Sequence, residues 1–206
     1  MARDLLRLAV AAAAYGFSLG ALDGWNRALN SAVKFPLLIL VTAALCALAY
    51  YLVARLLVPE LAFGQVQGLV LRLYRDTAWL LAALAPATLF LACTLTPATS
   101  REALNDYPFF LGLNIVLIAA AGTLALLQQA RELLVRHGLD LGRRLALIIG
   151  WLALSLFVGG PWAFYLRPFF GLSAIRAEDP GFCDGNAPDF RGATNFFEAV
   201  WHLVGG

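Results

Sequence analysis

An uncharged apolar stretch near the C-terminal end is the strongest constraint on what this chain can fold into. No charged residue occurs between Arg144 and Arg167, and about 20 apolar residues are enough to cross the hydrocarbon core of a bilayer. Trp162 and Tyr165 stand at the end of this stretch, where aromatic rings are commonly found as a span leaves the membrane. The pattern predicts a transmembrane helix over residues 145–166.

The composition extends this conclusion to most of the chain. Of the 206 residues, 61% are hydrophobic and 14% are charged, whereas a soluble domain carries roughly 25% charged residues. The net charge of +2 does not favour a nucleic-acid partner. We therefore expect an all-α integral membrane helical bundle of about five transmembrane helices with a short amphipathic C-terminal helix.

Four further apolar stretches complete the predicted bundle. Their expected spans lie near residues 5–22, 34–58, 77–96 and 107–129. The membrane domain would then cover residues 1–167, and residues 168–206 would form an extracytoplasmic tail. A four-span alternative, in which the first segment lies flat, stays open because that segment is short and rich in alanine.

The segments between the spans carry their own predictions. Asp23 to Lys34 is expected to be a short polar loop, which would place Pro36 in the first turn of the second span, where its missing N–H costs nothing. Glu60 to Asp76 has apolar residues at helical spacing with charged residues between them. That pattern is typical of an amphipathic segment on the membrane surface, so we expect a surface connector there.

The distribution of positive charge predicts the orientation. The N-terminus, the 55–76 connector and the 130–144 loop share one side, which holds nine Lys and Arg residues against six on the other. Acidic residues number five and eight on the same two sides. By the positive-inside rule the first side is cytoplasmic. We expect a multi-pass protein of the bacterial inner membrane with a cytoplasmic N-terminus and a periplasmic C-terminus.

Three glycines and one asparagine are candidate helix-packing residues. Gly16, Gly20 and Gly24 recur every fourth residue, so they share a helix face on which another backbone can approach closely. That backbone could belong to the same chain or to a second subunit. Asn114 is the most polar side chain well inside a span, and its amide is expected to bond to a neighbouring helix, with a ligand or pore contact as the alternative.

Residues near the expected outer interface form a second group of candidates. Lys34, Trp162 and Arg167 flank apolar segments on that side. Such residues are typical of anchoring among lipid headgroups. The alternative is the mouth of a pore that favours anions.

Patterns for catalysis and metal binding are missing from the sequence. The predicted spans contain no interior Asp, Glu or His, and the two histidines fall on opposite sides in the expected topology. The three cysteines include no CxxC pair. We therefore expect no enzyme activity, no catalytic residue, no metal site and no cofactor.

Three short motifs are spread over the chain: Lys34-Phe-Pro-Leu-Leu38 with Thr42, Trp162-Ala-Phe-Tyr-Leu-Arg-Pro-Phe-Phe-Gly171, and Asn195-Phe-Phe-Glu198. The last has the pattern of a capping box that opens a terminal amphipathic helix, docked on the membrane surface or on the bundle. Together the motifs resemble a family of uncharacterised bacterial multispan inner-membrane proteins. This resemblance implies the membrane class without an established activity. A looser likeness to Yip1-type five-span proteins rests on hydropathy and span count, and the short cytoplasmic motifs of eukaryotic Yip1 proteins are missing here.

These features favour a function based on packing. The expected function is a non-catalytic accessory, assembly or scaffold subunit of a membrane complex, and the alternative is a homo-oligomeric ion channel or pore. The expected partners are the lipid bilayer and either further copies of the chain or other membrane proteins, without nucleic acid.

Overall fold

The computed structural model describes residues 2–95, 103–137, 140–166, 194–198 and 201. The main elements in these ranges are α1 (Ala2–Gly20), the 3₁₀ turn η1 (Ala21–Asp23), α2 (Trp25–Leu57), α3 (Phe63–Thr94), α4 (Ala103–His137) and α5 (Leu141–Tyr165). No strand occurs in these described ranges.

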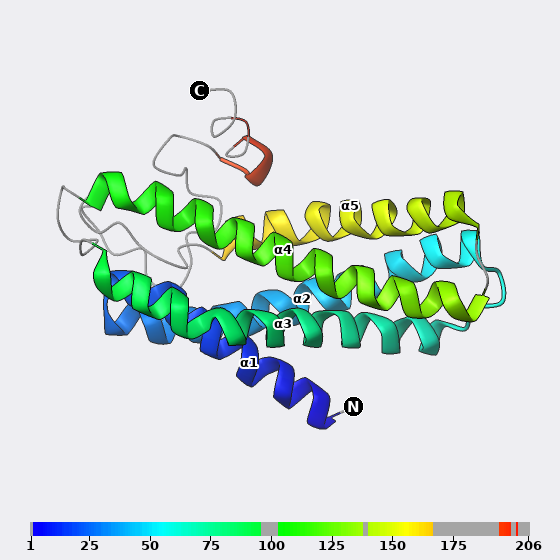
Figure 1. Cartoon of the computed structure of the whole chain (residues 1–206), viewed down its shortest axis with the longest axis horizontal. Helices are drawn as coiled ribbons and strands as arrows, with labels where there is room; N and C mark the ends of the chain where they lie inside the picture. The colour runs from blue at the N-terminus through cyan, green and yellow to red at the C-terminus, as the bar shows by residue number, and fades with distance from the viewer. Residues whose placement is uncertain (1, 96–102, 138–139, 167–193, 199–200, 202–206) are drawn as a thin grey trace.

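The helices run roughly along one axis and form an elongated bundle (Figure 1). α2, α3 and α4 extend along most of its length, whereas α1 covers only one half and packs on α2 and α3. α5 packs mainly on α2, and α4 mainly on α3. The bundle is therefore asymmetric: α1 is the most enclosed of the candidate spans, and α5 is the least enclosed.

All five long helices have the length and composition of membrane spans. Their outward surface is apolar, with side chains such as Leu48, Leu56 and Phe90 exposed by 59%, 84% and 70%. A water-soluble bundle would place charged side chains there. The all-helical bundle with five apolar helices is thus confirmed, and it indicates a multi-pass membrane protein.

The core consists of two main clusters of buried apolar side chains. One lies where α1, α2 and α3 meet and includes Leu8, Tyr15 and Phe35. The other joins α2, α3, α4 and α5 and includes Tyr50 and Trp151, whose rings stack with centroids 5.0 Å apart. The second cluster occupies the half of the bundle that α1 does not reach.

The predicted surface connector at residues 60–76 is wrong. α3 begins at Phe63 and continues without a break to Thr94. The apolar side of its first half is buried in the second cluster through Val66, Leu69, Val70 and Leu73, and Leu61, just before the helix, joins the same cluster. Helices α2, α4 and α5 also extend along this first half of α3. Their side chains, and not the membrane surface, cover its apolar stripe.

The predicted loop at residues 23–34 is also wrong. α2 begins at Trp25, directly after Gly24, so Pro36 lies in the helix interior and not in the first turn. Gly24 has φ 102°, a left-handed conformation that glycine adopts without the steric cost of a side chain. The short turn η1 and Gly24 therefore make the reversal for which a longer loop was predicted.

The capping segment at Asn195 forms one bond of the predicted capping box, and the Glu198 carboxylate takes its backbone partner one residue earlier, at Thr194. The backbone N–H of Glu198 donates to Asn195 Oδ1 at 3.0 Å, and Glu198 Oε2 accepts from the backbone N–H of Thr194 at 2.8 Å. A Cβ on Gly160 of α5 would overlap the ring of Phe196, so this ring fills the space that the glycine leaves. The segment is thereby docked on the bundle. Residues 167–193, which include Arg167 and most of the predicted tail, lie outside the described residues.

Candidate functional site

Polar side chains inside the bundle connect different helices. Tyr15 Oη on α1 donates to Asn114 Oδ1 on α4 at 2.7 Å, and Asn114 Nδ2 donates to the carbonyl of Phe110 at 2.8 Å. Asn114 is 1% exposed. The amide oxygen therefore accepts a hydrogen bond and the amide nitrogen donates one, and both partners belong to the same chain.

A second polar contact ties α2 to α5. The hydroxyls of Tyr50 and Ser155 share a hydrogen bond, and Ser155 Oγ also lies 2.9 Å from the carbonyl of Trp151. The indole N–H of Trp151 donates to the carbonyl of Tyr50 at 3.3 Å. The ring stack and these bonds together hold the least enclosed helix onto the bundle.

A charged network joins α1, α3 and α4. Arg75 Nη2 lies 2.9 Å from Asp76 Oδ1, and Arg75 Nη1 lies 3.4 Å from Asp4 Oδ1 on α1. The other oxygen of Asp76 accepts from Gln129 Nε2 on α4 at 2.8 Å. The side chains of Arg75 and Asp76 are partly exposed, so this network joins the three helices at the edge of the bundle.

The glycines proposed for packing have two different roles. A Cβ on Gly16 would come within 2.7 Å of the Cβ of Phe35 and closer still to the carbonyl oxygen of Ser31. A Cβ on Gly20 would lie 2.7 Å from the Cα of Ala28. Both glycines therefore face the α2 backbone within the same chain. Gly24 has no atom near its Cβ position and serves the turn into α2.

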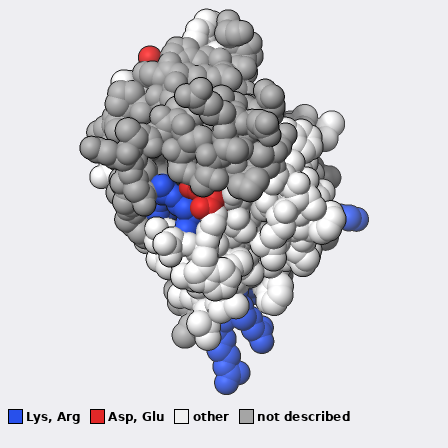
Figure 2. Space-filling view, turned by 90° about the vertical axis from the view of Figure 1, so that its left-hand side faces the viewer, with Lys and Arg blue, Asp and Glu red and all other residues white. Residues whose placement is uncertain are grey.

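Charged residues gather at the corner between α1 and α2. Asp23, Arg27, Ser31 and Lys34 follow one another at helical spacing, and Arg27 Nε lies 3.1 Å from Asp23 Oδ2. Lys34 is fully buried and Arg27 is 9% exposed. Figure 2 looks at this end of the molecule and shows basic and acidic atoms together in a recess. All four residues make further polar or ring contacts.

This placement bears on the predicted interface residues. The Lys34 side chain is enclosed by the protein, so it does not stand on the lipid-facing surface where headgroup anchoring requires it. Trp162 is partly buried and contacts Tyr165 edge-on, with centroids 5.9 Å apart. Arg167 lies outside the described residues. Of the three predicted interface residues, the structure therefore describes two, a buried Lys34 and a partly buried Trp162.

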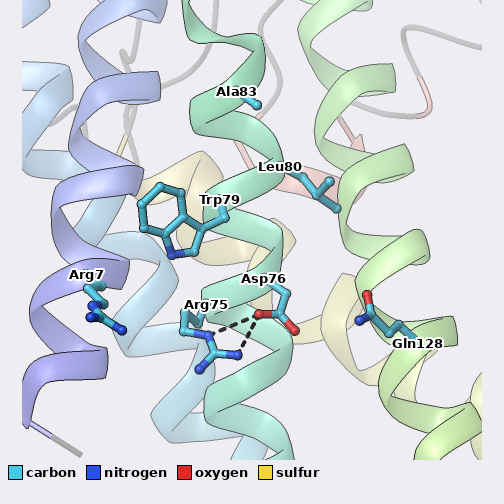
Figure 3. Close-up of a pocket in the computed structure, with 7 residues that line it drawn as sticks. All are labelled: Arg7, Arg75, Asp76, Trp79, Leu80, Ala83 and Gln128. Atoms are coloured by element: carbon cyan, nitrogen blue, oxygen red, sulfur yellow. Dashed lines mark hydrogen bonds and ion pairs between the residues drawn. The ribbon is translucent and has the colours of Figure 1, made fainter.

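An open groove lies at the other end of α1. Its floor is α3, and its walls are α1 and α4 (Figure 3). Its volume is about 490 Å³, and its lining residues are Arg7, Arg75, Asp76, Trp79, Leu80, Ala83 and Gln128. Arg7 comes from α1 and Gln128 from α4, while the others lie on α3.

The contacts in these sites join helices, and the groove is lined by both charged and apolar side chains. The described residues contain no group of three or more His, Cys, Asp or Glu that could hold a metal ion. The sequence interpretation overlooked Tyr15, the contact between Tyr50 and Ser155, and the groove. The sequence did contain a signal for Tyr15, Tyr50 and Ser155. Each is a hydroxyl-bearing residue within an apolar span, and such a side chain needs a hydrogen-bond partner.

The fold and these contacts define a class: a multi-pass helical bundle whose internal polar groups connect its own helices. No protein-family model, no curated protein and no solved structure matches the chain. The resemblance to uncharacterised bacterial inner-membrane proteins therefore stays a prediction.

Proposed function

We propose that the protein is a non-catalytic subunit of the bacterial inner membrane that acts as an accessory, assembly or scaffold component of a membrane complex. One observation carries this proposal: polar side chains within the spans bond across helices of the same chain, as in the pairs Tyr15–Asn114 and Tyr50–Ser155. A transport path needs polar groups that face a substrate. Polar groups that bond to each other stabilise the bundle instead. The apolar exterior can then contact lipid and other membrane proteins.

The placement of the glycines and of Lys34 disfavours the alternative of a homo-oligomeric channel. Gly16 and Gly20 pack on α2, so their face is occupied before a second copy could use it to line or tighten a pore. Lys34 is enclosed within one chain. A pore mouth would require its charge to face an axis shared by several copies.

The exposure of the cations supports the proposed orientation. Arg55, Arg131 and Arg143 are exposed at the end that holds the α2–α3 and α4–α5 connections. Arg27 and Lys34, at the opposite end, are buried. Among the described residues, exposed cations therefore lie at the first end, and the proposed cytoplasmic location of that end follows from the sequence count.

The experiment that tests the proposed function measures the assembly state and ion flux of the full chain. Native membranes would be extracted in mild detergent, and the detergent-corrected mass would be measured by light scattering with mass spectrometry of all components. We expect a stoichiometric complex with another membrane protein, and no ion flux when the isolated chain is placed in liposomes. A homo-oligomer of three or more copies that conducts ions, or a monomer without any stoichiometric membrane partner, would overturn the proposal.

A further inference from the structure

The groove between α1, α3 and α4 has a polar end and an apolar end. Arg7, Arg75 and Gln128 lie at one end, and Ala83 lies at the other, with Trp79 and Leu80 between them (Figure 3). Asp76 and Ala83 are seven residues apart on α3, which corresponds to about 10 Å along the helix. This gradient matches a molecule with a charged head and an apolar chain aligned with the helices.

The polar end holds two guanidinium groups and two carboxylates, and one of the guanidinium groups has no ion-pair partner among the described residues. Arg75 is compensated by Asp76 at 2.9 Å and contacts Asp4 at 3.4 Å. Arg7 is exposed, and within the described part of the chain it makes no hydrogen bond or ion pair. The pairing of Arg75 with carboxylates on α1 and α3 therefore holds one guanidinium in place, and Arg7 provides an unpaired guanidinium beside it.

The apolar end can accommodate an alkyl chain. Trp79, Leu80 and Ala83 line it, and Trp79 is 52% exposed. The small side chain of Ala83 keeps the groove open toward the middle of α3, while the indole N–H of Trp79 lies on the same side as the arginines (Figure 3). Indole rings are favoured at the boundary between headgroups and hydrocarbon, where one edge can donate a hydrogen bond.

We propose that this groove binds an anionic phospholipid, with the headgroup phosphate at Arg7 and Arg75 and the first part of an acyl chain over Leu80 and Ala83. A phosphate accepts charge-assisted hydrogen bonds from guanidinium groups on two helices. Basic pockets between transmembrane helices on the cytoplasmic side are suited to anionic lipid headgroups. The lipid class follows from the groove itself, and only the assignment to the cytoplasmic leaflet rests on the proposed orientation.

The test compares lipid binding by the full chain and matched charge variants. The chain would be reconstituted in nanodiscs of phosphatidylcholine with a minor fraction of phosphatidylglycerol. Native mass spectrometry would then count the lipids that stay bound to the protein when it is released from the nanodisc. Arg7→Gln removes the free cation of the groove, whereas Arg3→Gln removes an exposed cation from the same end of α1 that does not line the groove. We expect Arg7→Gln to lower the affinity for phosphatidylglycerol about tenfold and Arg3→Gln to leave it nearly unchanged.

A second variant and a soluble competitor separate the alternatives. Ala83→Phe should reduce retention of the lipid without a change in charge, and circular dichroism would verify that this variant is folded. Glycerol 3-phosphate at millimolar concentration should fail to displace the lipid. Equal effects of the two arginine variants, or equal retention of phosphatidylcholine and phosphatidylglycerol, would overturn the proposal, and displacement by glycerol 3-phosphate would identify a soluble phosphate as the ligand in place of a lipid.

Discussion

The close approach of α1 to α2 predicts that one added methyl group at Gly16 destabilises the protein. In Gly16→Ala the new Cβ would lie 2.7 Å from the Cβ of Phe35 and nearer to the Ser31 carbonyl oxygen. Favourable carbon–carbon contacts occur at about 3.5–4.0 Å. The obstruction includes backbone, which cannot turn aside as a flexible side chain can, so α1 must retreat by about 1 Å.

The cost of this retreat follows from the contacts that α1 makes. A gap of about 0.5–1 Å removes a quarter to a half of the dispersion energy of each affected contact, and Leu8, Ala12 and Leu19 are buried on this helix. Overpacking of this kind costs about 1–3 kcal/mol. The higher helix propensity of alanine returns about 0.5–1 kcal/mol. We therefore expect the free energy of unfolding to fall by about 1–2 kcal/mol.

The assay is reversible unfolding in mixed micelles with a denaturing detergent, monitored by circular dichroism. Gly122→Ala on α4 is the matched control, because no atom lies within 4 Å of its Cβ position. The control should be as stable as the original protein or slightly more stable. If Gly16→Ala were as stable as Gly122→Ala, the tight packing of α1 on α2 would be refuted.

Four further predictions follow from single contacts. Tyr15→Phe should lower the free energy of unfolding, and a double-mutant cycle with Asn114→Ala should give a coupling of about 0.6–1.7 kcal/mol; zero coupling would contradict the bond between α1 and α4. Asp76→Asn should destabilise by about 1 kcal/mol because Arg75 keeps only its longer contact with Asp4, whereas Asp140→Asn, in an exposed ion pair, should change stability by less than about 0.5 kcal/mol. Phe196→Ala should speed proteolysis of the C-terminal segment without altering unfolding of the bundle, and an unchanged cleavage rate would argue against docking on α5. Alkaline phosphatase fused after the last residue should be active in a bacterial host, because the C-terminus is proposed to be periplasmic. An inactive phosphatase fusion together with a fluorescent green fluorescent protein fusion at the same position would show the opposite orientation.

Much of the helical architecture was predictable because membrane spans obey a simple physical requirement. Backbone groups in hydrocarbon must bond within their own helix, and side chains there must be apolar. The stretch at 145–166 fulfils this requirement without ambiguity, and α5 covers it. The capping box at Asn195 was predictable for a similar reason, since its hydrogen bonds join residues that are close in sequence.

The errors occurred where one pattern fits two environments. Leu69 and Leu73 recur at a spacing that suits either a membrane surface or a protein core, and the choice depends on how far α2, α4 and α5 extend beside them. Lys34 gave a comparable ambiguity. A cation at the edge of an apolar run commonly reaches the headgroups, but here the bundle encloses it together with Arg27.

The class of protein, the number of long apolar helices and the candidate packing residues could be predicted from the amino-acid sequence, because these depend on local composition and periodicity. Only the tertiary structure decided that Gly16 faces α2, that Asn114 pairs with Tyr15, and that Arg7 and Arg75 border one groove. Such pairings join residues that are distant in the chain. They depend on which helix faces turn toward each other, and helical periodicity defines the faces without defining their neighbours.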